Sequence, residues 1–283
     1  MRIWINFLLV FHLSMVSFGA KQTTLKKQTT LKKKTTYDPT KFQVTYDPIK
    51  EVILPSGDQH NATVFFLHGQ GRSGFSQRNY IMNVTRDGQT VVLPNFKFIF
   101  PSAPKRRFTL HNRSMERIWY DIDYIGRNQT EDLTTMEKSI QGLLKLIRQE
   151  INQTGLSWNR IAIGGYGMGG KMALHMGYRV LVEIGAIFSL NGFLPENSTV
   201  FTAIEKTLSD GDRLPELFYG KTELLENKDD EDHEWHEKTY HELEAMGVKG
   251  KYSVANQGGE TKSDSVMDDL WNWLNCTLLG NSK

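Results

Sequence analysis

The feature that most constrains the fold of this 283-residue chain is a glycine-rich turn near its middle. An apolar run at residues 160–164 leads into the sequence Gly165-Tyr-Gly167-Met-Gly169, and helical spacing follows over residues 168–179. A short apolar run that turns sharply into a helix is typical of a buried strand in an alternating strand–helix pattern. The segment therefore predicts an α/β domain built on a parallel sheet.

The same alternation runs through residues 50–278, which we expect to form one domain. Besides residues 160–164, the apolar runs predict strands at 62–67, 96–100, 184–190, 214–219 and 252–255. The helical spacing predicts further helices at 131–152, 232–246 and 265–274. Strands that alternate with helices favour a mostly parallel sheet with helices on both faces.

The first nineteen residues predict a secretory signal peptide. Arg2 supplies a positive start, residues 3–16 are mostly apolar, and Ser17 and Gly19 place small residues before a cleavage site. The apolar run is too short to span a bilayer comfortably, and no later run is long enough. We therefore expect a secreted, extracellular protein with no transmembrane segment after signal removal, the alternative being an uncleaved signal anchor.

Residues 20–49 predict a basic, low-complexity, disordered tail. The sequence Lys-Gln-Thr-Thr-Leu-Lys occurs at residues 21–26 and again at 27–32, and residues 21–50 hold eight lysines against two aspartates. Such a tail could contact acidic surfaces or serve as a solvated linker. The remaining chain is net acidic, which excludes nucleic acid as an expected partner.

Seven tripeptides fit the acceptor pattern for N-linked glycans, more than chance supplies, which supports secretion. They begin at Asn61, Asn83, Asn112, Asn128, Asn152, Asn197 and Asn275. The one cysteine, Cys276, excludes an intrachain disulfide. It is expected to be an unreactive thiol in the last helix, the alternative being a bond to another chain.

The turn at residues 165–169 matches an enzyme motif except at one position. In an α/β-hydrolase, the sequence G-x-S-x-G stands between a strand and a helix and lifts the serine clear of the sheet. Here glycine replaces that serine, at Gly167. Further matching blocks are Leu67-His-Gly-Gln-Gly-Arg-Ser-Gly74, Pro101-Ser-Ala-Pro104, Trp119-Tyr-Asp121 and Ser189-Leu-Asn-Gly-Phe-Leu-Pro195. On these blocks, residues 50–278 resemble the acyl-protein thioesterase and lysophospholipase-type carboxylesterases.

The resemblance implies an α/β-hydrolase fold with no cofactor and no metal, and it assigns the catalytic positions. The nucleophile falls on Gly167, the acid on Glu223 and the base on Glu260, while the backbone amides of Gln70 and Met168 fall on the oxyanion hole. Gly167 has no side chain, and an ionised carboxylate is a poor base for a hydroxyl group. Independently of the alignment, no histidine follows residue 241, although the base comes last in this fold.

We therefore expect a secreted homologue that lacks hydrolase activity and binds an acyl chain or a partner protein. One alternative is an active carboxylic-ester or palmitoyl-protein thioester hydrolase with a displaced nucleophile, Ser73 or Ser189. A second alternative is a non-enzymatic secreted interaction glycoprotein that uses the basic tail. Met168, Met172 and Met176, at helical spacing, are expected in the core rather than in a lipid groove.

Histidines elsewhere in the chain have structural explanations. His68 matches the family's loop histidine and is expected to support that loop. His233 and His236, with Glu234 between them, could form part of a metal site. Because no third ligand is evident, a solvated acidic helix is the favoured interpretation of this segment.

Overall fold

The computed structural model describes residues 48–55, 57, 59–83, 85–86, 89–90, 93–222, 231–255 and 262–280, with backbone alone at 85–86, 89–90, 231–234 and 262–264. The predicted signal peptide at 1–19 and most of the predicted tail lie outside these residues. Glu223 and Glu260, the positions assigned to the acid and the base, also lie outside them.

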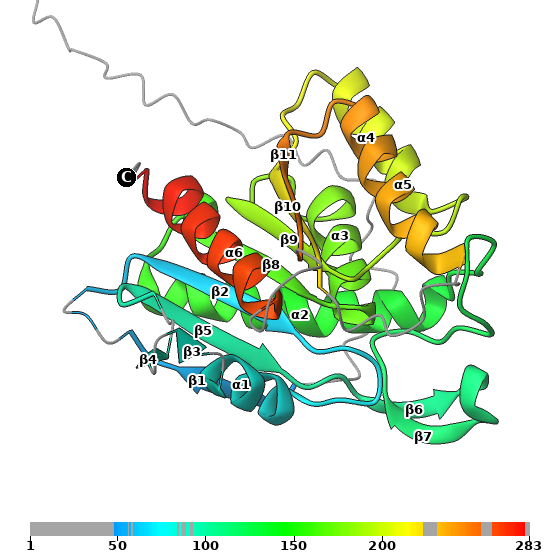
Figure 1. The fold of residues 1–283 in the computed structure, drawn as a ribbon, viewed down its shortest axis with the longest axis horizontal. Helices are drawn as coiled ribbons and strands as arrows, with labels where there is room; N and C mark the ends of the chain where they lie inside the picture. Colours follow the sequence, from blue (N-terminus) through cyan, green and yellow to red (C-terminus); the bar gives the residue numbers. More distant parts are fainter. Residues whose placement is uncertain are drawn as a thin grey trace, which may run out of the picture. The chain divides into compact units, whose positions relative to one another are not determined.

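The centre of the described fold is a seven-stranded sheet with the order β1-β5-β2-β8-β9-β10-β11. Its strands are β1 Lys50–Ile53, β2 Ala62–Leu67, β5 Phe96–Pro101, β8 Ile161–Tyr166, β9 Ala186–Leu190, β10 Glu216–Lys221 and β11 Gly250–Val254. Only the edge strand β1 is antiparallel to its neighbour, β5, and the remaining pairs are parallel. The predicted mostly parallel sheet is therefore confirmed (Figure 1).

Helices cover both faces of the sheet, as predicted (Figure 1). Helices α1 Gly74–Asn83 and α6 Lys262–Leu279 pack on one face. Helices α2 Leu133–Thr154, α3 Met168–Arg179, α4 Thr199–Ser209 and α5 Glu231–Ala245 pack on the other. Successive side chains of β2 therefore enter different cores, and all six residues of this strand are buried. Burial on both sides explains why five of its six residues are apolar, Thr63 being the exception.

Residues at both ends of helix α2 explain where the helix begins and ends. The Asp132 side chain accepts hydrogen bonds from the amides of Thr134 and Thr135, which caps the first turn. The helix ends at Gly155, whose φ of +72° is a left-handed conformation that glycine adopts without strain. The apolar positions that predicted the helix are buried: Met136, Ile140, Leu143, Leu144 and Ile147.

Several elements were not predicted. They are β1, α1, α4, the short strands β3 Thr85–Arg86 and β4 Gln89–Thr90, the hairpin of β6 Lys105–Phe108 and β7 Ser114–Arg117, and the 3-10 turns η2 Thr109–His111 and η3 Trp158–Arg160. The hairpin strands are mostly charged, so they lack the apolar alternation that marks a strand. No helix among the described residues is long and apolar enough to cross a membrane.

Candidate functional site

Gly167 forms a sharp turn between β8 and α3. Its backbone has φ +50° and ψ −115°, a region that is strained for any residue with a Cβ atom. Its amide donates to the carbonyl of Leu190 at 2.8 Å, and its carbonyl accepts from the amide of Lys171 at 3.0 Å. A Cβ atom placed on Gly167 would meet no other atom within 4 Å. The turn is therefore held by backbone contacts, and the space for a side chain is open.

The glycines on either side of this turn serve a different purpose. A Cβ atom on Gly165 or on Gly169 would overlap the backbone carbonyl of Leu67, at the end of β2. Both positions must lack a side chain because the turn packs directly against that strand. These two glycines thus allow the turn to pack closely against β2, whichever residue stands at position 167.

His68, directly after β2, supports the neighbouring loop, as predicted. Its Nδ1 bonds to the carbonyl of Gly69 at 2.7 Å, and its Nε2 accepts from the amide of Ala103 at 2.9 Å. The Trp119 indole donates to the His68 carbonyl at 2.8 Å. Burial lowers the pKa of His68 to about 4, so the ring is neutral at pH 7. A neutral ring protonated at Nδ1 satisfies both ring contacts.

Gln70 and Met168, whose amides the resemblance assigns to the oxyanion hole, line one cavity together with Gly167. The amides next to Gln70 are occupied, since Gly71 donates to Arg117 and Arg72 donates to Gly69. Within the described ranges, no backbone carbonyl accepts a hydrogen bond from Gln70 or from Met168. Met168 is the first residue of α3, where an amide has no partner inside the helix.

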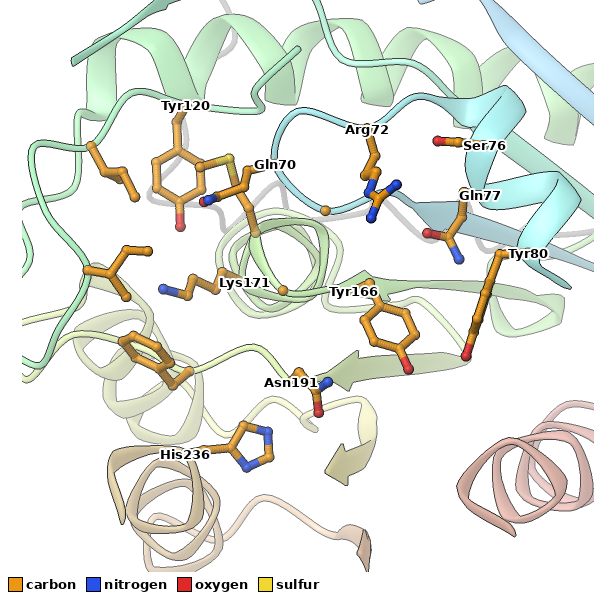
Figure 2. Close-up of a pocket in the computed structure, with 16 residues that line it drawn as sticks. Gln70, Arg72, Ser76, Gln77, Tyr80, Tyr120, Tyr166, Lys171, Asn191 and His236 are labelled. Atoms are coloured by element: carbon orange, nitrogen blue, oxygen red, sulfur yellow. The ribbon is translucent and has the colours of Figure 1, made fainter. Parts of the chain in front are cut away.

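A cavity of about 470 Å³ lies over Gly167 (Figure 2). This volume is within the range of small-molecule sites, roughly 300–1,000 Å³. Its described walls combine seven apolar or aromatic side chains and two glycines with seven polar or cationic side chains. They comprise Gly69, Gln70, Arg72, Ser76, Gln77, Tyr80, Tyr120, Ile122, Ile125, Tyr166, Gly167, Met168, Lys171, Asn191, Phe193 and His236.

Polar groups lie around the cavity in Figure 2, and the ring centroids of Tyr166 and Tyr80 lie 5.8 Å apart. The Tyr166 hydroxyl donates to Thr222 Oγ1 at 3.0 Å. Asn191 Nδ2 donates to the same oxygen at 2.6 Å, and the Thr222 amide donates to Asn191 Oδ1 at 2.8 Å. These bonds tie together the carboxyl ends of β8, β9 and β10. Burial raises the pKa of Tyr166, so its phenol stays neutral at pH 7.

Neither of the two serines considered as displaced nucleophiles is part of the cavity walls. Ser73 precedes α1, where its Oγ accepts from the amide of Ser76 at 3.2 Å. Ser189 is completely buried, and its Oγ fills the space that side chains on Gly170 and Gly192 would need. Neither serine lines the cavity, whereas Ser76 does.

His236 corrects the expectation of a solvated helix. It is completely buried, lines the cavity and lies 4.5 Å from the ring of Tyr219. His236, Tyr240 and Leu243 share one helix face, and this spacing in the sequence could have placed His236 inside. The side chains of His233 and Glu234 lie outside the described set. Among the side chains that are described, no group of three acidic, histidine or cysteine residues is arranged to hold a metal ion.

The methionines of α3 divide between core and cavity. Met172 and Met176 are completely buried in the core, as predicted. Met168 is also buried but lines the cavity. The other cavity residues that were not predicted, Lys171 and Phe193 among them, belong to segments whose sequence suggested only core or turn.

None of the seven glycosylation tripeptides has a buried asparagine. Asn61 and Asn275 are partly exposed, and the exposed positions are Asn83, Asn112, Asn128, Asn152 and Asn197. Cys276 is exposed in α6 and forms no disulfide with another described residue.

A mostly parallel sheet, covered on both faces and carrying a sharp turn between β8 and α3, defines an α/β-hydrolase fold. The sequence model of the phospholipase/carboxylesterase family matches residues 49–216. The chain belongs to this family, as the sequence motifs predicted.

Known relatives agree with the family. Lysophospholipase-like protein 1 of Mus musculus is 32% identical over 233 residues, which cover 82% of this chain and 92% of the relative. Acyl-protein thioesterase 1 of Yarrowia lipolytica is 32% identical over 164 residues, covering 58% of this chain and 70% of the relative. The crystal structure of Zea mays acyl-protein thioesterase 2 matches with a TM-score of 0.63 at 23% identity, covering 82% of this chain and 100% of that one.

Proposed function

We propose that this protein is a secreted, catalytically silent member of the family that binds an acyl-chain ligand in the cavity over Gly167. One observation carries the proposal. A glycine occupies the strained turn where an α/β-hydrolase presents its serine, and the backbone there keeps its φ of +50°. The site thus keeps its shape without a nucleophile at that position.

The argument for lost catalysis combines three positions. Gly167 offers no hydroxyl group, and the base falls by resemblance on Glu260 rather than on a histidine. In serine hydrolases, removal of a triad member leaves only about 10³–10⁴-fold acceleration over water, supplied by binding and the oxyanion hole. His236 faces the same cavity, but without a hydroxyl at 167 it has no nucleophile there to deprotonate.

The argument for an acyl ligand rests on the cavity walls and on the relatives. Tyr120, Ile122, Ile125 and Phe193 give the cavity an apolar surface large enough for a small molecule. The relatives are named for action on acylated proteins or for likeness to lysophospholipases. An acyl chain is common to both substrate classes, so it is the ligand class that the walls and the relatives favour together.

Hydrolysis is tested by labelling the purified protein with a fluorophosphonate probe, which reacts with activated serines. We expect no labelling above that of heat-denatured protein, with an active acyl-protein thioesterase as positive control. The variant Gly167→Ser with Glu260→His serves as a rescue, because the open space at 167 accepts a side chain. Saturable labelling of the unmodified protein, mapped to Ser73, Ser76 or Ser189, would instead establish the displaced-nucleophile alternative.

Secretion is tested separately in a eukaryotic expression host. We expect the protein in the medium, starting near residue 20, with a glycosidase-sensitive increase in mass. Protein retained inside the cell with an intact start and no glycan would contradict secretion, and it would leave the proposal about the cavity standing.

A further inference from the structure

The hairpin of β6 and β7 concentrates positive charge. It forms a two-stranded sheet of its own, separate from the seven-stranded sheet (Figure 1). Residues 105–117 hold five lysines and arginines against one glutamate, whereas residues 51–283 as a whole are net acidic. The sign of the charge on this hairpin is therefore opposite to that of the domain that carries it.

Three cations of the hairpin are exposed, and none of them pairs with a carboxylate of the described residues. They are Lys105, Arg107 and Arg113. Glu116, the one carboxylate of the hairpin, is already engaged, because its Oε1 lies 2.7 Å from Nδ1 of His111. The three positive charges are therefore available to a partner.

The register of the hairpin arranges its cations in a row. Lys105 lies opposite Arg117, and Arg107 lies opposite Met115, so these four side chains share one face of the hairpin. Successive side chains on one face of a strand are about 7 Å apart. The charges therefore repeat along the strand, as they do along a linear chain of charged groups.

Arg113 and Arg72 lie at the two ends of this row. Arg113 belongs to the turn of the hairpin, where its φ of +62° is uncommon for a residue other than glycine. At the other end, the amide of Gly71 donates to the carbonyl of Arg117 at 3.0 Å, which brings the backbone of the exposed Arg72 beside the hairpin. We call four exposed residues the cationic row: Lys105, Arg107, Arg113 and Arg72.

The hairpin holds its shape despite repulsion between its charges. Like charges directly opposite each other in a sheet are destabilising, and Lys105 faces Arg117 in this way. Other contacts hold the hairpin, since Nη1 of Arg106 donates to the carbonyls of Trp119 and Thr135, each at 2.7 Å. A bound polyanion would offset the repulsion, and a hairpin already held in place loses little conformational freedom on binding.

We propose that the cationic row binds a linear polyanion, a sulfated polysaccharide, that lies along the hairpin. Exposed clusters of lysine and arginine attract such chains, and sulfate groups that repeat along the chain can each meet one cation. Stable attachment to a bilayer combines charge with inserted apolar groups, and Met115 is the one large apolar side chain exposed in residues 105–117. The row therefore favours a polysaccharide over an anionic membrane, whatever the cavity binds.

Surface plasmon resonance with an immobilised, size-defined heparin oligosaccharide tests the proposal. Every protein in the series is the full chain after the signal peptide. Glutamine replaces the six lysines of residues 21–34 in each of them, because this basic segment could bind a polyanion by itself. Binding is measured before and after enzymatic removal of N-linked glycans, since the predicted acceptor Asn112 directly precedes Arg113.

The substitutions Lys105→Gln, Arg107→Gln and Arg113→Gln, combined in one hairpin variant, should weaken heparin binding about 3–100-fold, the range for three exposed ion pairs. A matched control removes the same charge at exposed positions of α2, α4 and the loop after α4: Arg148→Gln, Lys206→Gln and Arg213→Gln. The affinity of this control should stay within about twofold of the parent, because salt screens distant charges.

An equal loss of affinity in the hairpin variant and the control would mean that only net charge matters, and it would overturn the proposal. So would the absence of heparin binding both with and without glycans, or binding to phosphatidylserine vesicles in place of heparin. If circular dichroism shows that the hairpin variant is misfolded, lysine acetylation of the parent decides. Bound heparin should protect Lys105 and leave Lys206 reactive, and equal protection of both would contradict the proposal.

Discussion

Replacing Gly167 with alanine isolates the strain of the turn from every other effect. A Cβ atom at this position meets nothing within 4 Å, so no steric overlap contributes. What remains is the cost of holding a non-glycine residue at φ +50° and ψ −115°, about 1–3 kcal/mol. For a domain of about 150–250 residues, 1 kcal/mol lowers the melting temperature by about 2–4 °C. Gly167→Ala should therefore melt about 2–12 °C below the unmodified protein.

Differential scanning calorimetry measures this shift, and two other glycines calibrate it. Gly155 has φ +72° and open space, so Gly155→Ala reports the cost of an ordinary left-handed residue, about 1 kcal/mol. At Gly169 the added Cβ overlaps the backbone of β2, so Gly169→Ala should lose the most stability. A Gly167→Ala protein that melts at or above the unmodified temperature, or below Gly169→Ala, would refute the described geometry of the turn.

Two further predictions concern buried charge. The pKa of His68 is about 4 in the folded protein, whereas the ordinary histidine pKa is 6.5. The contribution of the neutral His68 ring to the free energy of unfolding is therefore complete above pH 6.5 and is lost as the pH falls toward 4. Urea unfolding should show roughly 3 kcal/mol of acid-induced destabilisation from this group, which is absent in His68→Gln. Lys97 pairs with Glu150 at 2.7 Å, and the Glu150 side chain is 1% exposed. Lys97→Met should therefore lower the free energy of unfolding, measured with urea, by about 3 kcal/mol, because it leaves the buried Glu150 carboxylate without its cation. Adding Glu150→Gln should restore much of this loss.

The fold was predictable where the sequence pattern reflects burial directly. The helical spacing of apolar residues from Met136 to Ile147 predicted α2, because each of these residues is buried in the core. The end of the same helix was less predictable, since the helix continues past Asn152 to Thr154. Helix α1 was missed because only Gly74, Gln77 and Ile81 are buried in it, too few for a helical stripe.

The candidate site was predictable at its backbone and less so at its walls. The glycine motif located Gly167, and the loop after β2 located His68 and Gln70. The walls come from segments distant in sequence, such as Tyr120 in a loop and His236 in α5. Only tertiary packing brings them together. The charge of Lys171 is visible in the sequence, but its burial in a cavity depends on Phe193 and Gln129 from other segments.

The contacts that hold the turn at Gly167 have a practical consequence. They run through the Leu190 carbonyl, the flanking glycines and the His68 loop, and none of them uses a side chain at 167. Gly167 can therefore be replaced by a residue with a reactive side chain. A single cysteine introduced there, after Cys276 is replaced by serine, would place a thiol at the floor of the cavity, and a bound ligand should slow its reaction with a small alkylating reagent.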